Sequence, residues 1–101
     1  MKTIRYAALA ASVALIAAGP AMADEALAKA KGCMACHDVK KKVVGPAYTD
    51  VAKKYKGAEG QASMVASITK GSSGKWGPIP MPPNKVSDEE AKKLAAWIQT
   101  L

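Results

Sequence analysis

The chain has 101 residues, of which 15 are basic and 8 acidic, with two cysteines, one histidine and no phenylalanine. This length allows one small domain, in which a hydrophobic core alone gives little net stability. All basic residues beyond residue 23 are lysines, and no aromatic ladder or recognised binding motif accompanies them, so we expect no nucleic-acid partner.

Residues 1–23 have the layout of a cleavable secretory signal peptide. Basic residues lie near the start, an apolar run covers 6–18, and small residues at 21–23 resemble a cleavage site. The run is shorter than the ~20 apolar residues that span a bilayer, so a signal is favoured over a membrane anchor. We therefore expect cleavage after Ala23 and a mature domain over 24–101 that is soluble in the periplasm.

The first elements of the mature domain are predicted from local signals. A short helix is expected over 25–31, with Asp24 as its N-cap and Gly32 as its terminator. Both cysteines of the chain follow directly. After them, the lysine-rich segment 38–47 is expected to form a loop in which Pro46 sets a turn.

Helix and loop signals alternate in the middle of the chain. Helices are predicted over 48–56 and 61–70, the second of them with Met64 in the core. Gly71 ends that helix. The glycines and prolines of 71–84 exclude regular secondary structure, so we expect an extended loop there.

The final helix has the clearest signature. Ser87 is a candidate N-cap, acidic residues fill the first turn, and Glu90 is positioned to complete a capping box. An apolar face then follows at helical spacing, formed by Ala91, Leu94, Ala95 and Ile98. No alternating strand pattern competes with these helices, so the sequence predicts an all-α fold.

The segment Cys33-Met34-Ala35-Cys36-His37 has the spacing of a haem c attachment motif. Two residues between the cysteines let both thiols reach vinyl groups at one edge of a porphyrin, and His37 is then directed at the iron. A bulky apolar cofactor would also complete a core that has few large side chains. We therefore predict one covalent haem c, attached through Cys33 and Cys36, with His37 as an axial ligand.

Two other kinds of site share parts of this motif. A thioredoxin-like redox pair has the same cysteine spacing but belongs with a βαβ pattern, which is not visible in the sequence. A zinc site needs a second pair of ligands, whereas His37 is the single histidine and the chain has no further cysteine. Both interpretations are disfavoured.

A methionine is the expected sixth ligand of an electron carrier, because a thioether favours ferrous iron and raises the reduction potential. Met34 lies inside the attachment motif and cannot reach the opposite face, and Met64 fits the apolar stripe of its predicted helix. Met81 lies within 77–83, where prolines limit the backbone freedom that must be lost when a weak ligand is held on iron. Met81 is therefore the predicted distal ligand.

In these residues the sequence resembles the cytochrome c-551/552 family, the short bacterial class I cytochromes c. The resemblance covers nearly all of 24–101 and depends on 31–37, 44–48, 76–84 and the helix start at Ser87. It implies a small class I cytochrome c fold, in which about four to five short helices wrap around one covalently bound haem. It also implies that the first and last helices cross.

The resemblance assigns roles to three further residues. Pro46 would accept a hydrogen bond from the His37 ring and fix its tautomer. Trp76 would donate its indole N–H toward a haem propionate, and Asn84 would form a hydrogen bond near the Met81 sulfur. Without the resemblance, all three would be interpreted as turn or packing residues.

The predicted function is outer-sphere transfer of single electrons between respiratory complexes, and not enzymatic catalysis. The resemblance suggests a monomer that is reduced by the membrane cytochrome bc1 complex and donates to a periplasmic nitrite reductase or a terminal oxidase. Several lysines could surround the exposed cofactor edge and attract acidic partners, namely Lys29, Lys31, Lys40, Lys41, Lys42, Lys53 and Lys54.

Two rival functions use the same cofactor. A small peroxidase or nitric-oxide-handling protein needs an open sixth position and usually a distal polar residue, and no second histidine is present to act as the distal base. A gas or redox sensor module needs an output domain, and none is visible in the sequence.

Overall fold

The computed structural model describes residues 20–101, so most of the predicted signal peptide lies outside the described residues. The chain forms α1 (Pro20–Ala30), a short 3-10 helix η2 (Cys33–Ala35), α2 (Tyr48–Lys54), α3 (Gly57–Lys70) and α4 (Asp88–Gln99). Within this part of the chain, β structure is limited to two isolated bridges. The all-α prediction is confirmed. None of the described helices is long and apolar enough to cross a membrane.

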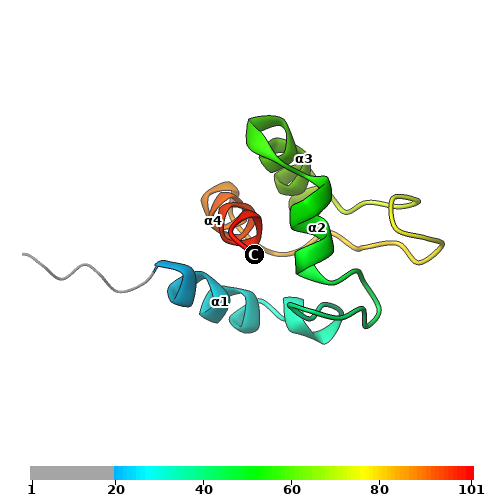
Figure 1. Ribbon diagram of the computed structural model, residues 1–101, viewed down its shortest axis with the longest axis horizontal. Helices are drawn as coiled ribbons and strands as arrows, with labels where there is room; N and C mark the ends of the chain where they lie inside the picture. The colour runs from blue at the N-terminus through cyan, green and yellow to red at the C-terminus, as the bar shows by residue number, and fades with distance from the viewer. Residues whose placement is uncertain (1–19) are drawn as a thin grey trace, which may run out of the picture.

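Helix α4 lies at the centre of the fold. Figure 1 shows it nearly end-on, with α1 on one side and α2 and α3 on the other, and it packs against all three. The predicted contact between the first and last helices is therefore present. The predicted core positions of α3 and α4 are confirmed, and the buried apolar residues are Ala28, Ala47, Tyr48, Val51, Met64, Ile68, Ala91, Leu94, Ala95, Trp97 and Ile98.

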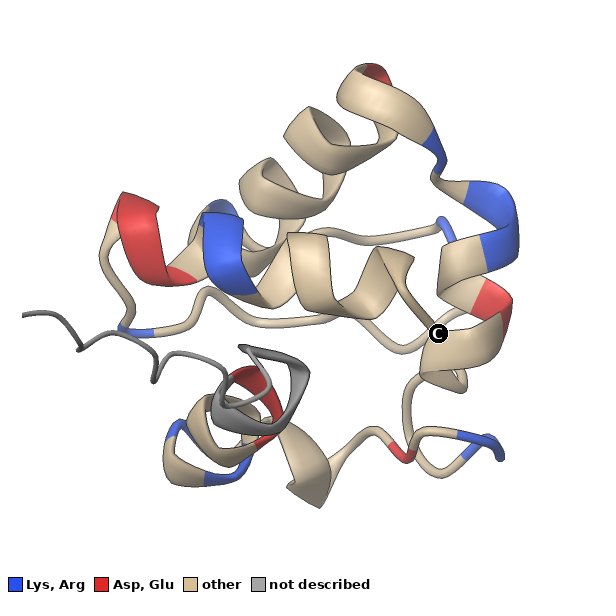
Figure 2. Cartoon of the chain, turned by 60° about the vertical axis from the view of Figure 1, so that its left-hand side comes forward, with Lys and Arg blue, Asp and Glu red and all other residues tan. Residues whose placement is uncertain are grey.

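Charged residues lie in the loops and along the helices, including Lys92 and Lys93 within α4. Figure 2 shows lysines at the end of α2 and in the loop after η2, whereas acidic residues fill the first turn of α4. Two of the lysines that could surround the cofactor edge are paired with carboxylates. Lys29 Nζ lies 3.7 Å from Glu25, and Lys31 Nζ lies 3.5 Å from Glu90.

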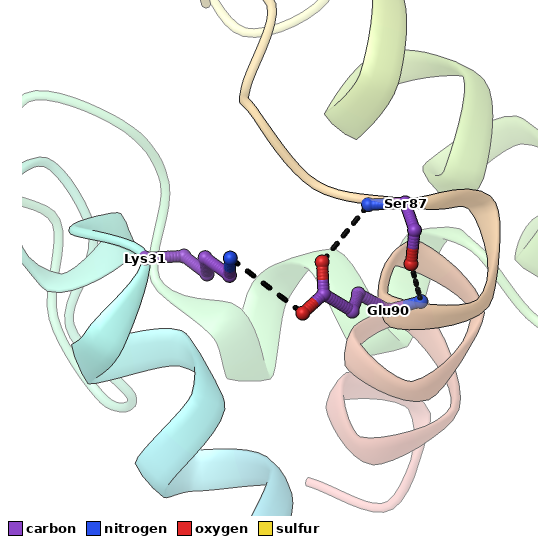
Figure 3. Close-up of polar contacts among 3 residues, drawn as sticks. All are labelled: Lys31, Ser87 and Glu90. Atoms are coloured by element: carbon purple, nitrogen blue, oxygen red, sulfur yellow. Dashed lines mark hydrogen bonds and ion pairs between the residues drawn. The ribbon is translucent and has the colours of Figure 1, made fainter.

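The predicted capping box at the start of α4 is present, as Figure 3 shows. The backbone N–H of Glu90 donates to Ser87 Oγ at 3.0 Å, and the backbone N–H of Ser87 donates to Glu90 Oε1 at 2.9 Å. That second hydrogen bond, together with the nearby Lys31 ammonium, lowers the pKa of the Glu90 carboxyl. The same carboxylate thus caps α4 and links it to the end of α1.

The start of the first helix differs from the prediction. Helix α1 begins at Pro20 and not at residue 25, so Asp24 lies inside the helix and is not its N-cap. The physical reason is the alanine-rich composition of 21–23, since alanine has the highest helix propensity and continues the helix backwards. The predicted end is close: α1 stops at Ala30, and Gly32 follows in the left-handed region with φ 78°.

The two middle helices also have different bounds from those predicted. Helix α2 ends at Lys54, two residues before the predicted end, and α3 begins at Gly57, four residues before the predicted start. A tight turn between them explains both shifts. At Gly60 a Cβ would lie 2.3 Å from the backbone carbon of Tyr55, so the first turn of α3 packs directly on the end of α2. Gln99 of α4 donates to two carbonyls of this turn, those of Tyr55 and Gly57.

Candidate cofactor site

A deep, largely apolar cavity opens between α2, α3, α4 and the loops at 36–47 and 71–84. Its empty volume is about 1020 Å³, including the open mouth. Core residues form its floor, namely Tyr48, Val51, Met64, Ile68, Leu94 and Ile98. The attachment motif and the predicted distal ligand both reach the same cavity, through Cys33, Cys36, His37 and Met81.

Both cysteines lie at the edge of the cavity as free thiols. Cys33 is half-buried, Cys36 is exposed, and η2 holds them on one short turn. Burial raises the pKa of the Cys33 thiol, although a hydrogen bond with Tyr48 opposes the shift. Redox-active cysteine pairs depend on a lowered thiol pKa, so this environment does not suit the thioredoxin-like alternative. Residues 20–101 also gather no group of three or more His, Cys, Asp or Glu side chains that could hold a metal ion.

The His37 ring is fixed on three sides and is buried, with 9% of its surface exposed. Its Nδ1 lies 2.8 Å from the Pro46 carbonyl oxygen. A carbonyl can accept but not donate, so Nδ1 carries a proton, and in the neutral ring the lone pair is therefore on Nε2. The Tyr48 ring stacks on the imidazole with centroids 4.8 Å apart. These contacts therefore orient the ring so that Nε2 of the neutral imidazole is available as a metal ligand.

Gly45 closes the third side of the His37 ring. A Cβ at this position would lie 2.5 Å from His37 Cε1, so the backbone approaches the ring more closely than any side chain allows. Its own N–H donates to the Cys36 carbonyl at 2.7 Å, which ties it to the attachment motif. Sequence reasoning missed the contacts of Gly45 and Tyr48 with the ring. Gly45 and Tyr48 lie within two residues of Pro46, which was predicted to contact the ring, so contacts by these neighbours could have been expected.

Substitution of Gly45 by alanine is expected to tilt the His37 ring and weaken its hydrogen bond to Pro46. We expect a loss of about 1–3 kcal/mol in the free energy of unfolding, as for overpacking in a core, and a larger high-spin fraction in the ferric spectrum. Denaturant unfolding and visible spectroscopy measure the two effects. Gly57→Ala is the control, because its positive φ costs about 1–2 kcal/mol while its surroundings are open. A Gly45→Ala protein with native spectrum and stability would contradict the prediction.

The loop at 71–84 is held to the cavity by its backbone. Ser72 and Met81 exchange two hydrogen bonds, from Ser72 N to Met81 O at 2.9 Å and from Met81 N to Ser72 O at 2.8 Å. Gly71 allows this approach, since its φ is +83° and a Cβ there would lie 2.7 Å from the Met81 carbonyl oxygen. The Met81 backbone is therefore anchored independently of its side chain, which lines the cavity and packs on the core.

Trp76 and Asn84 lie in different surroundings. Trp76 lines the cavity, is 37% exposed, and has Lys54 Nζ 4.8 Å from its ring centroid. Asn84 does not line the cavity in this structure. Its Nδ2 donates to the Ile68 carbonyl at 3.1 Å and is 3.4 Å from the Pro82 carbonyl, so it braces the end of the loop against α3. Its hydrogen bond near the Met81 sulfur stays a prediction.

The residues of the cavity fit haem c. An apolar lining suits the macrocycle, two free thiols at the edge suit its vinyl groups, and Nε2 of the His37 ring, whose Nδ1 is bonded to Pro46, suits its iron. A thioether is available from Met81 in the same cavity.

Comparisons with known proteins agree with this chemistry. The family model for cytochrome c matches residues 21–101. Cytochrome c-552 of Hydrogenobacter thermophilus is 59% identical, covering 83% of this chain and 87% of that protein. Cytochrome c-552 of Nitrosomonas europaea is 55% identical, covering 100% and 99% of the two chains.

Solved structures agree as well. The crystal structure of wild-type Nitrosomonas europaea cytochrome c552 superposes with a TM-score of 0.72 at 52% identity, covering 75% of this chain and 96% of that chain. The resemblance to the c-551/552 proteins is thereby confirmed. The chain belongs to the cytochrome c family of electron carriers, with the class I fold of its c-551 and c-552 relatives and one covalent haem c.

Proposed function

We propose that this protein is a periplasmic monohaem carrier that transfers single electrons between respiratory complexes by an outer-sphere route. One observation carries the proposal: His37, oriented by Pro46, and Met81, anchored through Ser72, both line the same apolar cavity. Two such ligands would fill both axial positions of an iron, which leaves no position for a substrate and favours a carrier over a peroxidase.

The chain's own residues hold and tune the cofactor. When bound, haem c supplies an iron that alternates between the ferric and ferrous states. Cys33 and Cys36 would each hold the haem through a thioether, in which the S–H has added across one vinyl group. His37 would supply its Nε2 lone pair to the metal, and Met81, in the same cavity, would supply its sulfur lone pair.

Three residues are proposed to act on these ligands and on the cofactor edge. The Pro46 carbonyl accepts the Nδ1 proton of His37, which fixes the tautomer and raises the basicity of Nε2. Trp76, at the mouth of the cavity, donates its indole N–H toward a propionate. Asn84 donates to the Ile68 carbonyl at the end of the loop that holds Met81, and its amide is proposed to form a hydrogen bond near the Met81 sulfur when the haem is bound.

Electrons are proposed to enter and leave through the open mouth of the cavity. Val44 and Ile79 line the cavity and are 46% and 63% exposed, so they form an apolar rim that a partner protein can cover. Lysines from α2 and from the loop after η2 would attract acidic partners and make association sensitive to salt.

The proposed physiological setting rests on the sequence and on the family resemblance. A signal peptide at 1–23 would export the chain, and the domain at 24–101 would act as a monomer in the periplasm. The membrane cytochrome bc1 complex is the proposed reductant, and a nitrite reductase or a terminal oxidase is the proposed acceptor. The relatives named cytochrome c-552 support an electron carrier, and the choice of partners is what the resemblance to the c-551/552 family implies.

The visible spectrum of the purified periplasmic protein tests the proposal. We expect covalently bound haem, low-spin ferric iron and the weak far-red band of a methionine sulfur ligand. These signals would mean that both axial positions are filled. A high-spin ferric spectrum without the far-red band would mean an open sixth position, and the peroxidase or ligand-binding function would then replace the carrier.

A further inference from the structure

Lys75 is the lysine that lines the cofactor cavity. It belongs to the loop that follows α3, one residue before Trp76. Among the lining residues of the described chain, which are otherwise apolar, hydroxyl, thiol or imidazole groups, Lys75 alone carries an ammonium or carboxylate group. Lys75 is not among the lysines that the sequence analysis placed around the exposed cofactor edge.

Two serines of α3 hold the Lys75 ammonium group in place. Its Nζ lies 3.3 Å from Ser67 Oγ and 3.5 Å from Ser63 Oγ, and Ser67 also lines the cavity. Hydroxyl groups orient an ammonium ion but do not neutralise its charge. The ion pairs found within residues 20–101 involve Lys29 and Lys31, so the charge of Lys75 has no carboxylate partner among the described residues.

Aromatic rings and a second lysine lie close to this ammonium group. From α2, the Tyr55 ring lies 5.8 Å from Lys75 Nζ, and Lys54 Nζ lies 5.6 Å from that ring and 4.8 Å from the Trp76 ring. Lys54 and Tyr55 are the ionisable groups in these aromatic contacts, and α3 contributes the two serine hydroxyls and, one helical turn before Ser63, the carboxylate of Glu59, which forms no ion pair with Lys75. This end of the cavity suits an anion.

We propose that Lys75, oriented by Ser63 and Ser67, binds a propionate carboxylate of the haem and thereby raises the reduction potential of the protein. The inference rests on the proposed function. A carboxylate entering a largely apolar cavity must be paired or hydrogen-bonded, because desolvation of an unpaired charge is costly. Lys75 offers a cation at the cavity wall, and its neighbour in the chain, Trp76, which also lines the cavity, is the residue proposed to donate to the same group.

The sign of the effect follows from the charges. An anionic propionate favours ferric iron, which carries one more positive charge than ferrous iron. An ammonium ion bound to the propionate offsets this effect and favours the ferrous state. The Lys75 ammonium also favours the ionised form of the propionate, so it lowers the pKa of that carboxyl group.

The test compares the holoprotein with its Lys75→Gln, Lys75→Arg and Lys93→Gln variants. Lys93 is an exposed lysine of α4 that does not line the cavity, so its loss removes the same charge elsewhere. Reduction potentials are measured by equilibrium titration across the neutral pH range. In Lys75→Gln we expect the ferrous-to-ferric ratio to fall by roughly threefold or more, with redox-linked proton uptake at higher pH. Lys75→Arg should stay close to the parent protein, and Lys93→Gln should change little.

The measurements test this inference and the proposed function independently of each other. If Lys75→Gln matches Lys93→Gln in both potential and pH profile, Lys75 does not bind the propionate and the inference is wrong. The far-red band of the same samples reports the axial ligands independently. Its presence would leave the carrier function standing in that case, whereas its absence in the parent protein would overturn the proposed function itself.

Discussion

Substitution of Met81 by alanine is expected to remove the far-red band, convert the ferric iron to a high-spin or water-ligated form, and lower the reduction potential sharply. The thioether favours the ferrous state, so its loss shifts the equilibrium toward ferric iron. The protein should remain folded. The hydrogen bonds between Ser72 and Met81 use backbone atoms, and the Met81 side chain is only half-buried, so we expect a loss of about 1–2 kcal/mol in stability.

Met64 provides a matched control for this prediction. It lines the same cavity but is 5% exposed and belongs to the core of α3. Met64→Ala should therefore cost more stability, about 2–5 kcal/mol, and yet keep the far-red band and most of the reduction potential. Visible spectroscopy, equilibrium redox titration and denaturant unfolding of both variants distinguish the roles. Loss of the band in Met64→Ala with its retention in Met81→Ala would exchange the two assignments.

The parts of the fold that were predicted correctly are those determined by neighbours in the sequence. Helix α4 has its cap, its charged first turn and its apolar face within one short segment, so the capping box of Ser87 and Glu90 could be recognised directly. The start of α3 could not be recognised, because it depends on Gly60 packing against the end of α2. The start of α1 was misplaced because a possible cap at Asp24 was preferred to the helix propensity of the preceding alanines.

The candidate site shows the same division. His37 and Met81 were chosen from a motif and a proline-rich loop, and the structure brings both to one cavity. The contacts that orient His37 were not predicted, since the Tyr48 stacking and the Gly45 approach depend on how the loop at 36–47 folds back. Lys75 was missed for a similar reason. Only the path of the 71–84 loop across α3 turns a lysine in a glycine-rich segment toward the cavity.

Double replacement of Cys33 and Cys36 by alanine is expected to leave a largely unfolded protein at ambient temperature. Much of the core faces the cavity, including Val51, Met64 and Leu94, so without the cofactor their apolar surfaces would contact water instead of a macrocycle. A domain of this size has little stability in reserve, so the loss should approach the ~5 kcal/mol at the lower end of the range for native proteins.

Far-UV circular dichroism and denaturant unfolding of the purified variant measure this effect. The single variant Cys36→Ala is the matched control, because the half-buried Cys33 can still form one thioether while His37 remains available to the iron. We expect Cys36→Ala to fold with reduced stability and to retain bound haem, between the parent and the double variant. A compact double variant that unfolds cooperatively without haem would show that the helices complete their own core, and that the cavity exists before the cofactor enters it.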